Sequence, residues 1–388
     1  MKVISYGCQD ITQADIDAVV DVLRSDNLTQ GPAITHFEER VAAETGAAYA
    51  IAVSNATAAL HIACLALDLG LGDWLWTTPN TFVASANCAL YCGAQVDFVD
   101  IDPLTYNLCP IKLELKLIQA EKNNKLPKIV VPVHLTGQSC DMAAIFSLSQ
   151  RFGFKIIEDA SHAIGGKYKD EPIGNCRYCD IAVFSFHPVK IITTGEGGMS
   201  LTNSTHLAER MRLLRSHGIT RDSALMHKPM DGPWYYEQVS LGYNYRMTDI
   251  QAALGGSQLT RLANYVERRH AIADRYNTLL AELPLTLPWQ HPDNYSAYHL
   301  YVIRLQLNKI KVNHLEVFNA LRSKGIMVNL HYIPIHTQPF YQQMGFNKGD
   351  FPEAERYYLE AVSIPMHPSL TDAEQDFVVS SLRNILIL

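Results

Sequence analysis

The sequence predicts an α/β fold in which a large domain with a mostly parallel sheet precedes a smaller α+β domain. In the first two thirds of the 388 residues, short apolar runs alternate with amphipathic stretches, which is typical of a parallel sheet covered by helices on both faces. The last third departs from this alternation. We expect the large domain to span residues 1–247, and the connecting helix with the small domain to span residues 248–388.

Seven apolar runs predict the strands of the large sheet: Tyr49–Val53, Trp74–Thr78, Gln95–Val99, Ile129–Val133, Lys155–Glu158, Ile181–Ser185 and Met199–Thr202. A helix-start pattern at Thr12-x-x-Asp15 opens the first expected helix, whose apolar stripe is Ile16, Val19, Val20 and Leu23. The further helices are expected to begin at Thr35 and end before Gly46, and to cover Asn55–Leu67, Phe82–Tyr91 and Met142–Phe152.

In the last third, a long helix from about Thr248 to Leu283 is expected to connect the two domains. The small domain is expected to contain the strand Tyr298–Leu307, the helix His314–Lys324, the strand Ile326–Tyr332 and the helix Thr371–Ile387.

Composition limits the function. Hydrophobic residues make up 48% of the chain and charged residues 18%, as in folded soluble proteins. The net charge of −7 gives no general support for binding nucleic acid or an anionic membrane. No run of 18 apolar residues occurs, and the first residues lack the apolar core of a signal peptide. We therefore expect a cytoplasmic protein whose eight cysteines are reduced.

Cys176 and Cys179 form the one C-x-x-C pattern. A structural zinc site needs two more ligands, and no second pair has suitable spacing. We interpret these residues as part of a loop before a buried strand.

Polar residues after strands are the functional candidates, because ligands of open α/β sheets bind at the carboxyl ends of the strands. Residues 54–59 (Ser-Asn-Ala-Thr-Ala-Ala) follow one strand and begin a helix. Free N–H groups and the dipole at a helix start favour an anion such as phosphate, and the Thr57 hydroxyl can add a bond. The same residue types also serve as ordinary helix caps.

Glu158 and Asp159 follow another strand, and His162 comes three residues later. A carboxylate beside a pyridine nitrogen keeps that nitrogen protonated, which is the role of an aspartate in many pyridoxal-phosphate enzymes. A helix-capping aspartate with a surface histidine is the alternative interpretation.

Lys190 lies five residues after the strand-end Ser185 and shortly before the glycine-rich residues 193–198. A lysine in a water-poor pocket has a lowered pKa and attacks carbonyl groups. The ordinary alternative is a solvated loop lysine. The glycines argue against it, since they permit unusual backbone angles and close approach to a ligand.

Together these segments resemble the DegT/DnrJ/EryC1/StrS family of sugar aminotransferases, which are pyridoxal 5′-phosphate (PLP) enzymes of fold type I, the aspartate-aminotransferase fold. The most specific match is Phe184-Ser185-Phe186-His187-x-x-Lys190, followed by Thr194–Gly198 and preceded by Glu158–His162. The resemblance extends from Leu28 to His336. It implies an aminotransferase that holds PLP in its large domain.

Within that family the chain is most similar to the enzymes that aminate a UDP-linked 4-keto sugar in pseudaminic acid biosynthesis. The segments that carry this similarity are Leu28–Gly31, Thr77–Ala84, Ser161–Ala163, Leu214–Gly218 and Phe340–Gln343. The resemblance also implies glutamate as the amino donor.

The resemblance assigns roles to single residues. Lys190 matches the Schiff-base lysine and Asp159 the aspartate at the pyridine nitrogen. The other implied cofactor contacts are Thr57 and Ala58 in the phosphate turn, Phe82 on the ring, His162 near the ring hydroxyl, Ser185 at the phosphate, and Asn244 at the phosphate of the neighbouring subunit. Asn244 therefore implies a homodimer with shared active sites.

The same resemblance implies a set of substrate contacts. They are Tyr6, Asp26, Asn27, Leu28, Thr29, Ala56, Ser185, Asn244, His331, Tyr332, Ile333 and Pro334.

Two other functions stay open. The first is a PLP enzyme of another class, such as a sugar dehydratase or an amino-acid lyase; the dehydratases of the family carry histidine in place of Lys190, which disfavours that branch. The second is a binding protein or regulator on the same fold. Such proteins usually lose the lysine or carry a DNA-binding segment, and this chain has the lysine and no basic appendage.

Overall fold

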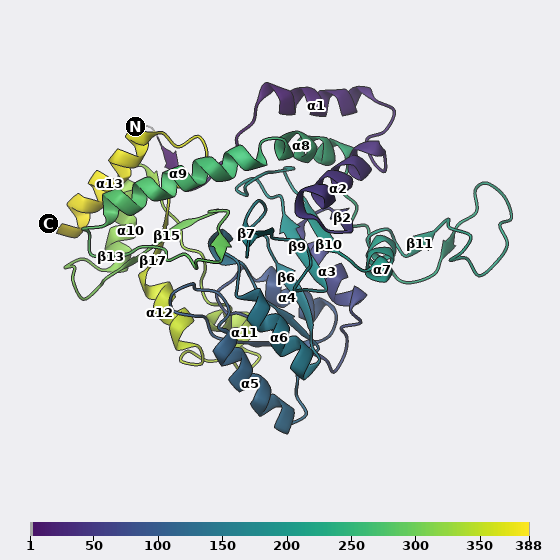
Figure 1. Cartoon of the computed structure of the whole chain (residues 1–388), viewed down its shortest axis with the longest axis horizontal. Coiled ribbons are helices and arrows are strands. Elements are labelled where there is room, and N and C mark those ends of the chain that lie inside the picture. Colours follow the sequence, from purple (N-terminus) through teal and green to yellow (C-terminus); the bar gives the residue numbers. More distant parts are fainter. Residues whose placement is uncertain (1–2, 388) are drawn as a thin grey trace.

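A seven-stranded sheet forms the centre of the large domain in the computed structural model, which describes residues 3–387 (Figure 1). Its strands lie in the order β2-β10-β9-β6-β5-β3-β4. Only β10 runs antiparallel to its neighbours, so the sheet is mostly parallel, as predicted. The strands are β2 (Tyr49–Val53), β3 (Trp74–Thr77), β4 (Gln95–Phe98), β5 (Ile129–Val131), β6 (Lys155–Asp159), β9 (Ile181–Ser185) and β10 (Gly198–Thr202).

Helices cover both faces of this sheet because successive strand residues point to opposite sides. Ile51 and Val53 of β2 pack toward one face, and Ala50 and Ala52 toward the other. The first face is covered by α3 (Ala56–Ala66), α4 (Ala84–Tyr91) and α7 (Thr205–Arg215). The other face is covered by α2 (Pro32–Thr45), α5 (Pro110–Lys122), α6 (Met142–Phe152) and α8 (Asp249–Leu259).

The C-terminal part has its own apolar core around an antiparallel three-stranded sheet. That sheet consists of β13 (Leu285–Thr286), β15 (Tyr301–Leu305) and β17 (Ala361–Ile364). The helices packed with it are α9 (Leu262–Leu280), α10 (His314–Ser323) and α13 (Asp372–Ile387). The N-terminal strand β1 (Ile4–Ser5) pairs in parallel with β16 (Ile326–Met327), so β1 and the last helix, α13, lie in the same part of the molecule (Figure 1).

Shorter elements complete the chain. They are the helix α12 (Pro352–Glu360), the single turns η1 (Leu135–Gly137), η2 (Ile335–Thr337) and α11 (Pro339–Gln342), and the short strands β7 (Lys167–Tyr168), β8 (Glu171–Pro172) and β14 (Asn294–Tyr295). None of the helices between residues 3 and 387 combines the length and apolar character that a membrane span requires.

Several predicted elements were wrong in extent, and the strand expected at Tyr298–Leu307 covers only Tyr301–Leu305. The second helix begins at Pro32 rather than Thr35, because Gly31 is its N-cap and the carboxylate of Asp249 accepts hydrogen bonds from the backbone N–H groups of Gly31 and Ala33. The expected connecting helix is two helices, α8 and α9, with a break at residues 260–261. The expected strand at 326–332 ends at Met327, and the Tyr332 N–H beyond it donates to Asn80 of the large domain.

The first helix, α1 (Gln13–Arg24), begins as predicted, and Asp15 Oδ2 accepts from the Thr12 N–H at 2.9 Å. Its apolar stripe does not face a core, since Ile16 is 47% exposed and Leu23 is 54% exposed. The buried residue of this helix is Asp15, which bonds Arg261.

A hairpin at residues 217–242 projects from the body of the molecule (Figure 1). It contains the short antiparallel strands β11 (Ile219–Thr220) and β12 (Glu237–Gln238). Five of its large hydrophobic side chains are exposed: Leu225, Met230, Trp234, Tyr236 and Leu241.

Candidate active site

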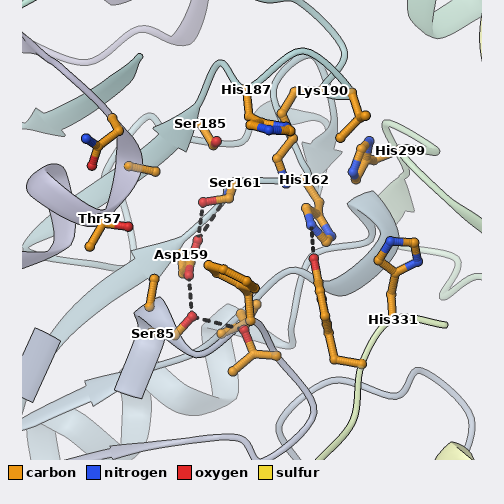
Figure 2. A pocket seen from close by; sticks show the side chains of 18 of the residues that line it. Thr57, Ser85, Asp159, Ser161, His162, Ser185, His187, Lys190, His299 and His331 are labelled. Atoms are coloured by element: carbon orange, nitrogen blue, oxygen red, sulfur yellow. Dashed lines mark hydrogen bonds between the residues drawn. The ribbon is translucent and has the colours of Figure 1, made fainter. Parts of the chain in front are cut away.

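A cavity of about 830 Å³ lies where the strand ends of the large sheet meet the C-terminal part. Ten of the predicted site residues line it together (Figure 2). They are Tyr6, Ala56, Thr57, Phe82, Asp159, His162, Ser185, Lys190, His331 and Tyr332. Their sequence positions span more than 300 residues, so the fold itself assembles the site.

Asp159 ends strand β6 and is held by two serines. Its Oδ1 accepts from the Ser161 hydroxyl at 2.6 Å, and its Oδ2 accepts from the Ser85 hydroxyl at 2.7 Å (Figure 2). The side chain is buried. A buried carboxylate with hydrogen bonds on both oxygens is fixed in orientation, which suits a partner for a cationic nitrogen.

Glu158 points to the opposite face of the sheet from its neighbour Asp159, as strand alternation requires. Its Oε1 bonds His134 Nε2 at 2.8 Å, and Glu158 does not line the cavity. Only one of the two adjacent carboxylates therefore belongs to the site.

Lys190 follows strand β9 on a short turn and is partly exposed to the cavity. Burial lowers the pKa of Lys190 to about 8, and the charge of Asp159 acts in the opposite direction. About one tenth of this amine is therefore unprotonated at pH 7, far more than for an ordinary lysine with a pKa of about 10.4, and the unprotonated form is the one that a nucleophile or general base requires.

His162 connects the two parts of the molecule. Its Nδ1 accepts from the Thr136 N–H at 3.2 Å, so Nε2 carries the proton and donates to the Tyr332 hydroxyl oxygen, also at 3.2 Å. Burial and the positive charge of Lys190 hold the pKa of His162 well below its ordinary value, consistent with this neutral form. The tyrosine hydroxyl keeps its own proton for a further bond.

The start of α3 forms the candidate phosphate turn. Asn55 caps the helix by accepting from the Ala58 N–H at 2.9 Å, which leaves the N–H groups of Ala56 and Thr57 at the cavity. The hydroxyl-bearing residues Thr57 and Ser185 both line the cavity here (Figure 2). This combination of helix start and hydroxyls suits an oxyanion.

The glycine-rich segment packs against the backbone of this turn. A Cβ on Gly198 would lie 2.6 Å from the backbone nitrogen of Ala56, so only glycine lets β10 approach the turn this closely. Gly195 has a φ of +80°, which is the unusual backbone angle expected for this segment.

Eight predicted residues do not line the cavity of their own chain. They are Asp26, Asn27, Leu28, Thr29, Ala58, Asn244, Ile333 and Pro334. Asn244 is exposed and pairs through its backbone with Ser216 at the base of the hairpin. Thr29 bridges to Thr248, so the residues at 26–29 lie close to the same surface segment.

Several residues of the site were not predicted from the sequence. Ser85 bonds Asp159 from a position 74 residues away. His299 lines the cavity with its ring 4.4 Å from that of His162, and its buried Nδ1 has no hydrogen-bond partner among the described residues. Nothing in the local sequence marks either residue, since both reach the site through tertiary contacts. Ser161 had a local signal, because it follows Asp159 by two residues.

The C-x-x-C residues lie on the loop before β9, as interpreted from the sequence. The Cys176 thiol is buried and donates to the Leu201 carbonyl at 3.3 Å. Burial and this hydrogen bond give Cys176 a structural role in the core.

The cavity suits the PLP that the resemblance implies. It combines an anchored carboxylate for a pyridinium nitrogen (Asp159), an amine of lowered pKa (Lys190), an oxyanion turn (Ala56 and Thr57) and the aromatic ring of Phe82.

Comparison with known proteins agrees with this site. The profile of the DegT/DnrJ/EryC1/StrS aminotransferase family matches residues 9–383. The chain is 40% identical over 386 residues to the spore coat polysaccharide biosynthesis protein SpsC of Bacillus subtilis, covering 99% of this chain and 97% of that protein. It is 35% identical over 384 residues to the UDP-4-amino-4,6-dideoxy-N-acetyl-beta-L-altrosamine transaminase of Campylobacter jejuni, covering 99% and 97%.

Solved structures show the same similarity. Helicobacter pylori PseC, an aminotransferase involved in the biosynthesis of pseudaminic acid, superposes with a TM-score of 0.90 at 31% identity and full coverage of both chains. The sugar aminotransferase Spr1654 of Streptococcus pneumoniae, described as putative, superposes in its PLP form with a TM-score of 0.88 at 30% identity, covering 99% of this chain and 98% of that one. The chain thus belongs to the DegT/DnrJ/EryC1/StrS family and is a PLP-dependent sugar aminotransferase.

Proposed function

We propose that this enzyme transfers an amino group from glutamate to C4 of a UDP-linked 4-keto-6-deoxy N-acetylated hexose. The product is UDP-4-amino-4,6-dideoxy-N-acetyl-β-L-altrosamine, an intermediate of pseudaminic acid biosynthesis. The observation that carries the chemistry is the single cavity that holds Lys190, Asp159 and the Thr57 turn. The choice of sugar is supported by the relative of that name, which matches along nearly its whole length.

Each residue has a chemical task in this scheme. PLP, when bound, supplies the electron sink that allows a proton to leave the α-carbon of an amino acid. The Lys190 amine accepts that proton as a general base and returns it as a general acid, and its pKa of about 8 suits both steps near neutral pH. Asp159, fixed by Ser85 and Ser161, keeps the pyridine nitrogen protonated.

The remaining cavity residues orient the ligands and exclude water. Phe82 and Tyr332 place two rings at the cavity with centroids 6.1 Å apart, and His162 fixes the Tyr332 hydroxyl. His331 is buried, and burial together with the charge of Lys190 lowers its pKa to about 3, so it is a neutral hydrogen-bonding group. Neutral polar groups of this kind suit the hydroxyls of a sugar.

We propose that the active enzyme is a homodimer whose two sites are shared. Asn244 lies on the surface outside its own cavity, beside a hairpin that projects from the body (Figure 1). The exposed Trp234 and Leu241 of this hairpin, and Ile16 and Leu23 on α1, are apolar side chains of the kind that protein partners cover. In such a dimer Asn244 contacts the cofactor phosphate of the partner subunit.

The proposed substrate can be tested with the purified protein, PLP and glutamate labelled with ¹⁵N at its amino group. Given a small panel of nucleotide-linked 4-keto sugars, the enzyme is expected to label the UDP-linked N-acetylated sugar fastest, and NMR of the product is expected to show the altrosamine configuration. Lys190→Ala is expected to form no labelled sugar. Full turnover by Lys190→Ala contradicts the proposed mechanism, whereas faster labelling of another sugar contradicts only the proposed substrate.

A second substrate has a specific observation in its favour. SpsC shares more identity with this chain, at 40%, than the altrosamine transaminase does, at 35%. A different nucleotide-linked 4-keto sugar, used for a polysaccharide, is therefore the alternative. The same panel of sugars separates the two.

A further inference from the structure

The segment at residues 243–246, which carries Asn244, is held on two sides by the large domain. On one side, a backbone bridge joins Asn244 to Ser216, which directly follows helix α7. On the other side, the Tyr245 carbonyl accepts from the Ser54 N–H at 2.8 Å, just before the candidate phosphate turn. The backbone of the segment is therefore fixed next to the turn of its own subunit.

The side chains of this segment face two different surroundings. Tyr243 and Tyr245 stack on each other, with ring centroids 4.9 Å apart and ring planes at 12°. Both pack against His61 of helix α3, at centroid distances of 4.8 and 5.9 Å. Because side chains alternate along an extended segment, Asn244 between them points the other way, and it is exposed.

One hydrogen bond joins this aromatic stack to helix α3. His61 Nδ1 and the Tyr245 hydroxyl oxygen are 3.2 Å apart. The Tyr243 hydroxyl, by contrast, makes no hydrogen bond in the part of the chain that the structure describes. Helix α3 is buried along most of its length, and His61 is only 5% exposed, so His61 is a rigid anchor for Tyr245.

We propose that His61 and Tyr245 are positioning residues for Asn244, which they hold where it reaches the cofactor phosphate of the partner subunit. This inference rests on the shared dimer proposed above. An asparagine on an unanchored surface segment has to be ordered when the ligand binds, and this ordering lowers the affinity. The bond between His61 and Tyr245 orders the segment before the cofactor arrives.

Titration of the cofactor-free protein with PLP measures this contribution without any turnover. Tyr245→Phe removes only the hydroxyl and is expected to raise the apparent dissociation constant of PLP roughly three- to tenfold, as the loss of one hydrogen bond predicts. Tyr243→Phe is the matched control, since it removes a hydroxyl without a described partner from the same stack, and it is expected to leave the constant unchanged. Unchanged PLP affinity in Tyr245→Phe overturns the proposal.

A second variant shows whether the two residues act together. His61→Phe keeps an aromatic ring against the tyrosines and removes the nitrogen that bonds Tyr245. It is expected to weaken PLP binding as much as Tyr245→Phe does, and the double variant is expected to be no weaker than either single variant, because both changes remove the same bond. Additive effects of the two changes contradict the proposal.

Mixed dimers separate the positioning of Asn244 from a local effect on helix α3. When Lys190→Ala and Asn244→Ala subunits are combined, the complete site takes its lysine from the Asn244→Ala subunit and its asparagine from the other subunit. Tyr245→Phe in the Lys190→Ala subunit is therefore expected to lower the activity at limiting PLP severalfold. The same change in the Asn244→Ala subunit is expected to cause no comparable loss.

The outcomes of this experiment are distinguishable. An equal loss from either placement of Tyr245→Phe means that Tyr245 acts on the turn of its own subunit, which overturns the proposal while the shared dimer stands. If the parent mixture of Lys190→Ala and Asn244→Ala subunits regains no activity, the shared dimer itself is wrong, and the inference falls with it.

Discussion

The position of Lys190 in the fold changes the acidity of its side chain. Its burial disfavours the charged ammonium, while Asp159 favours it, and the pKa near 8 shows that burial prevails. An ordinary surface lysine has a pKa of about 10.4. The two kinds of lysine therefore differ in how their reactivity depends on pH.

This difference gives a prediction for the cofactor-free protein. Acylation of an amine requires the unprotonated form, so the rate at Lys190 is expected to rise with pH and to level off above about pH 8. The rates at ordinary surface lysines are expected to keep rising to about pH 10. Peptide mapping after short exposure to an acylating reagent measures both kinds of lysine in one sample. A pH profile of Lys190 parallel to that of the surface lysines would contradict the lowered pKa.

At the same scale, the sequence could predict only some of the site residues. Asp159 ends a strand, Thr57 and Lys190 lie within five residues after one, and the strands of an α/β sheet bring their carboxyl ends together. Ser85 and His299 follow no strand of the large sheet and reach the cavity through packing of α4 and of the C-terminal part. The distances that bring these two residues to the cavity cannot be inferred from their spacing in the sequence.

At the scale of elements, strand β10 and helix α3 illustrate how closely a strand can support a binding turn. A Cβ at position 198 would lie against backbone atoms of Asn55 and Ala56. These backbone atoms cannot move aside as the end of a flexible side chain can. Gly198→Ala is expected to destabilise the fold by about 1–3 kcal/mol and to weaken cofactor binding, because the turn must shift.

Gly256→Ala is the matched control for this prediction. A Cβ at Gly256, inside helix α8, meets only Arg40 at 3.6 Å, an ordinary contact. Removing a helix-interior glycine is expected to stabilise the protein by about 0.5–1 kcal/mol. Thermal unfolding and titration with PLP should thus separate the two variants, with Gly198→Ala impaired in both. Normal PLP affinity in Gly198→Ala would mean that the turn does not hold the phosphate.

The bounds of the helices and strands also show what sequence patterns can and cannot predict about the fold. All seven strands of the large sheet were confirmed, since buried parallel strands have continuous apolar runs bounded by turns. The start of α2 was predicted three residues late, because the carboxylate that accepts from its first N–H groups belongs to Asp249, more than 200 residues away. The strand expected at 326–332 was too long, because its second half, residues 329–332, lines the cavity instead of continuing the strand.

At the scale of the whole molecule, the exposed stripe of α1 and the projecting hairpin support the same interpretation. An amphipathic stripe predicts a buried face, and in the single chain Ile16 and Leu23 are left exposed. The prediction of burial and the exposure in one chain are reconciled if a second copy covers this surface. An amphipathic pattern marks side chains that are buried in the assembled protein. The pattern therefore does not distinguish an internal core from an interface between subunits.

A shared active site makes a specific prediction for mixed dimers. If Asn244 completes the partner's site, then Lys190→Ala and Asn244→Ala dimers are each expected to be nearly inactive. After the two variants are mixed and their subunits exchange at random, about half of the dimers contain one of each, and one of their two sites has both native residues. About one quarter of the unaltered activity is therefore expected to return, as measured by sugar amination at equal total protein. If mixing restores no activity although native mass spectrometry shows exchanged dimers, Asn244 acts within its own subunit and the sites are not shared.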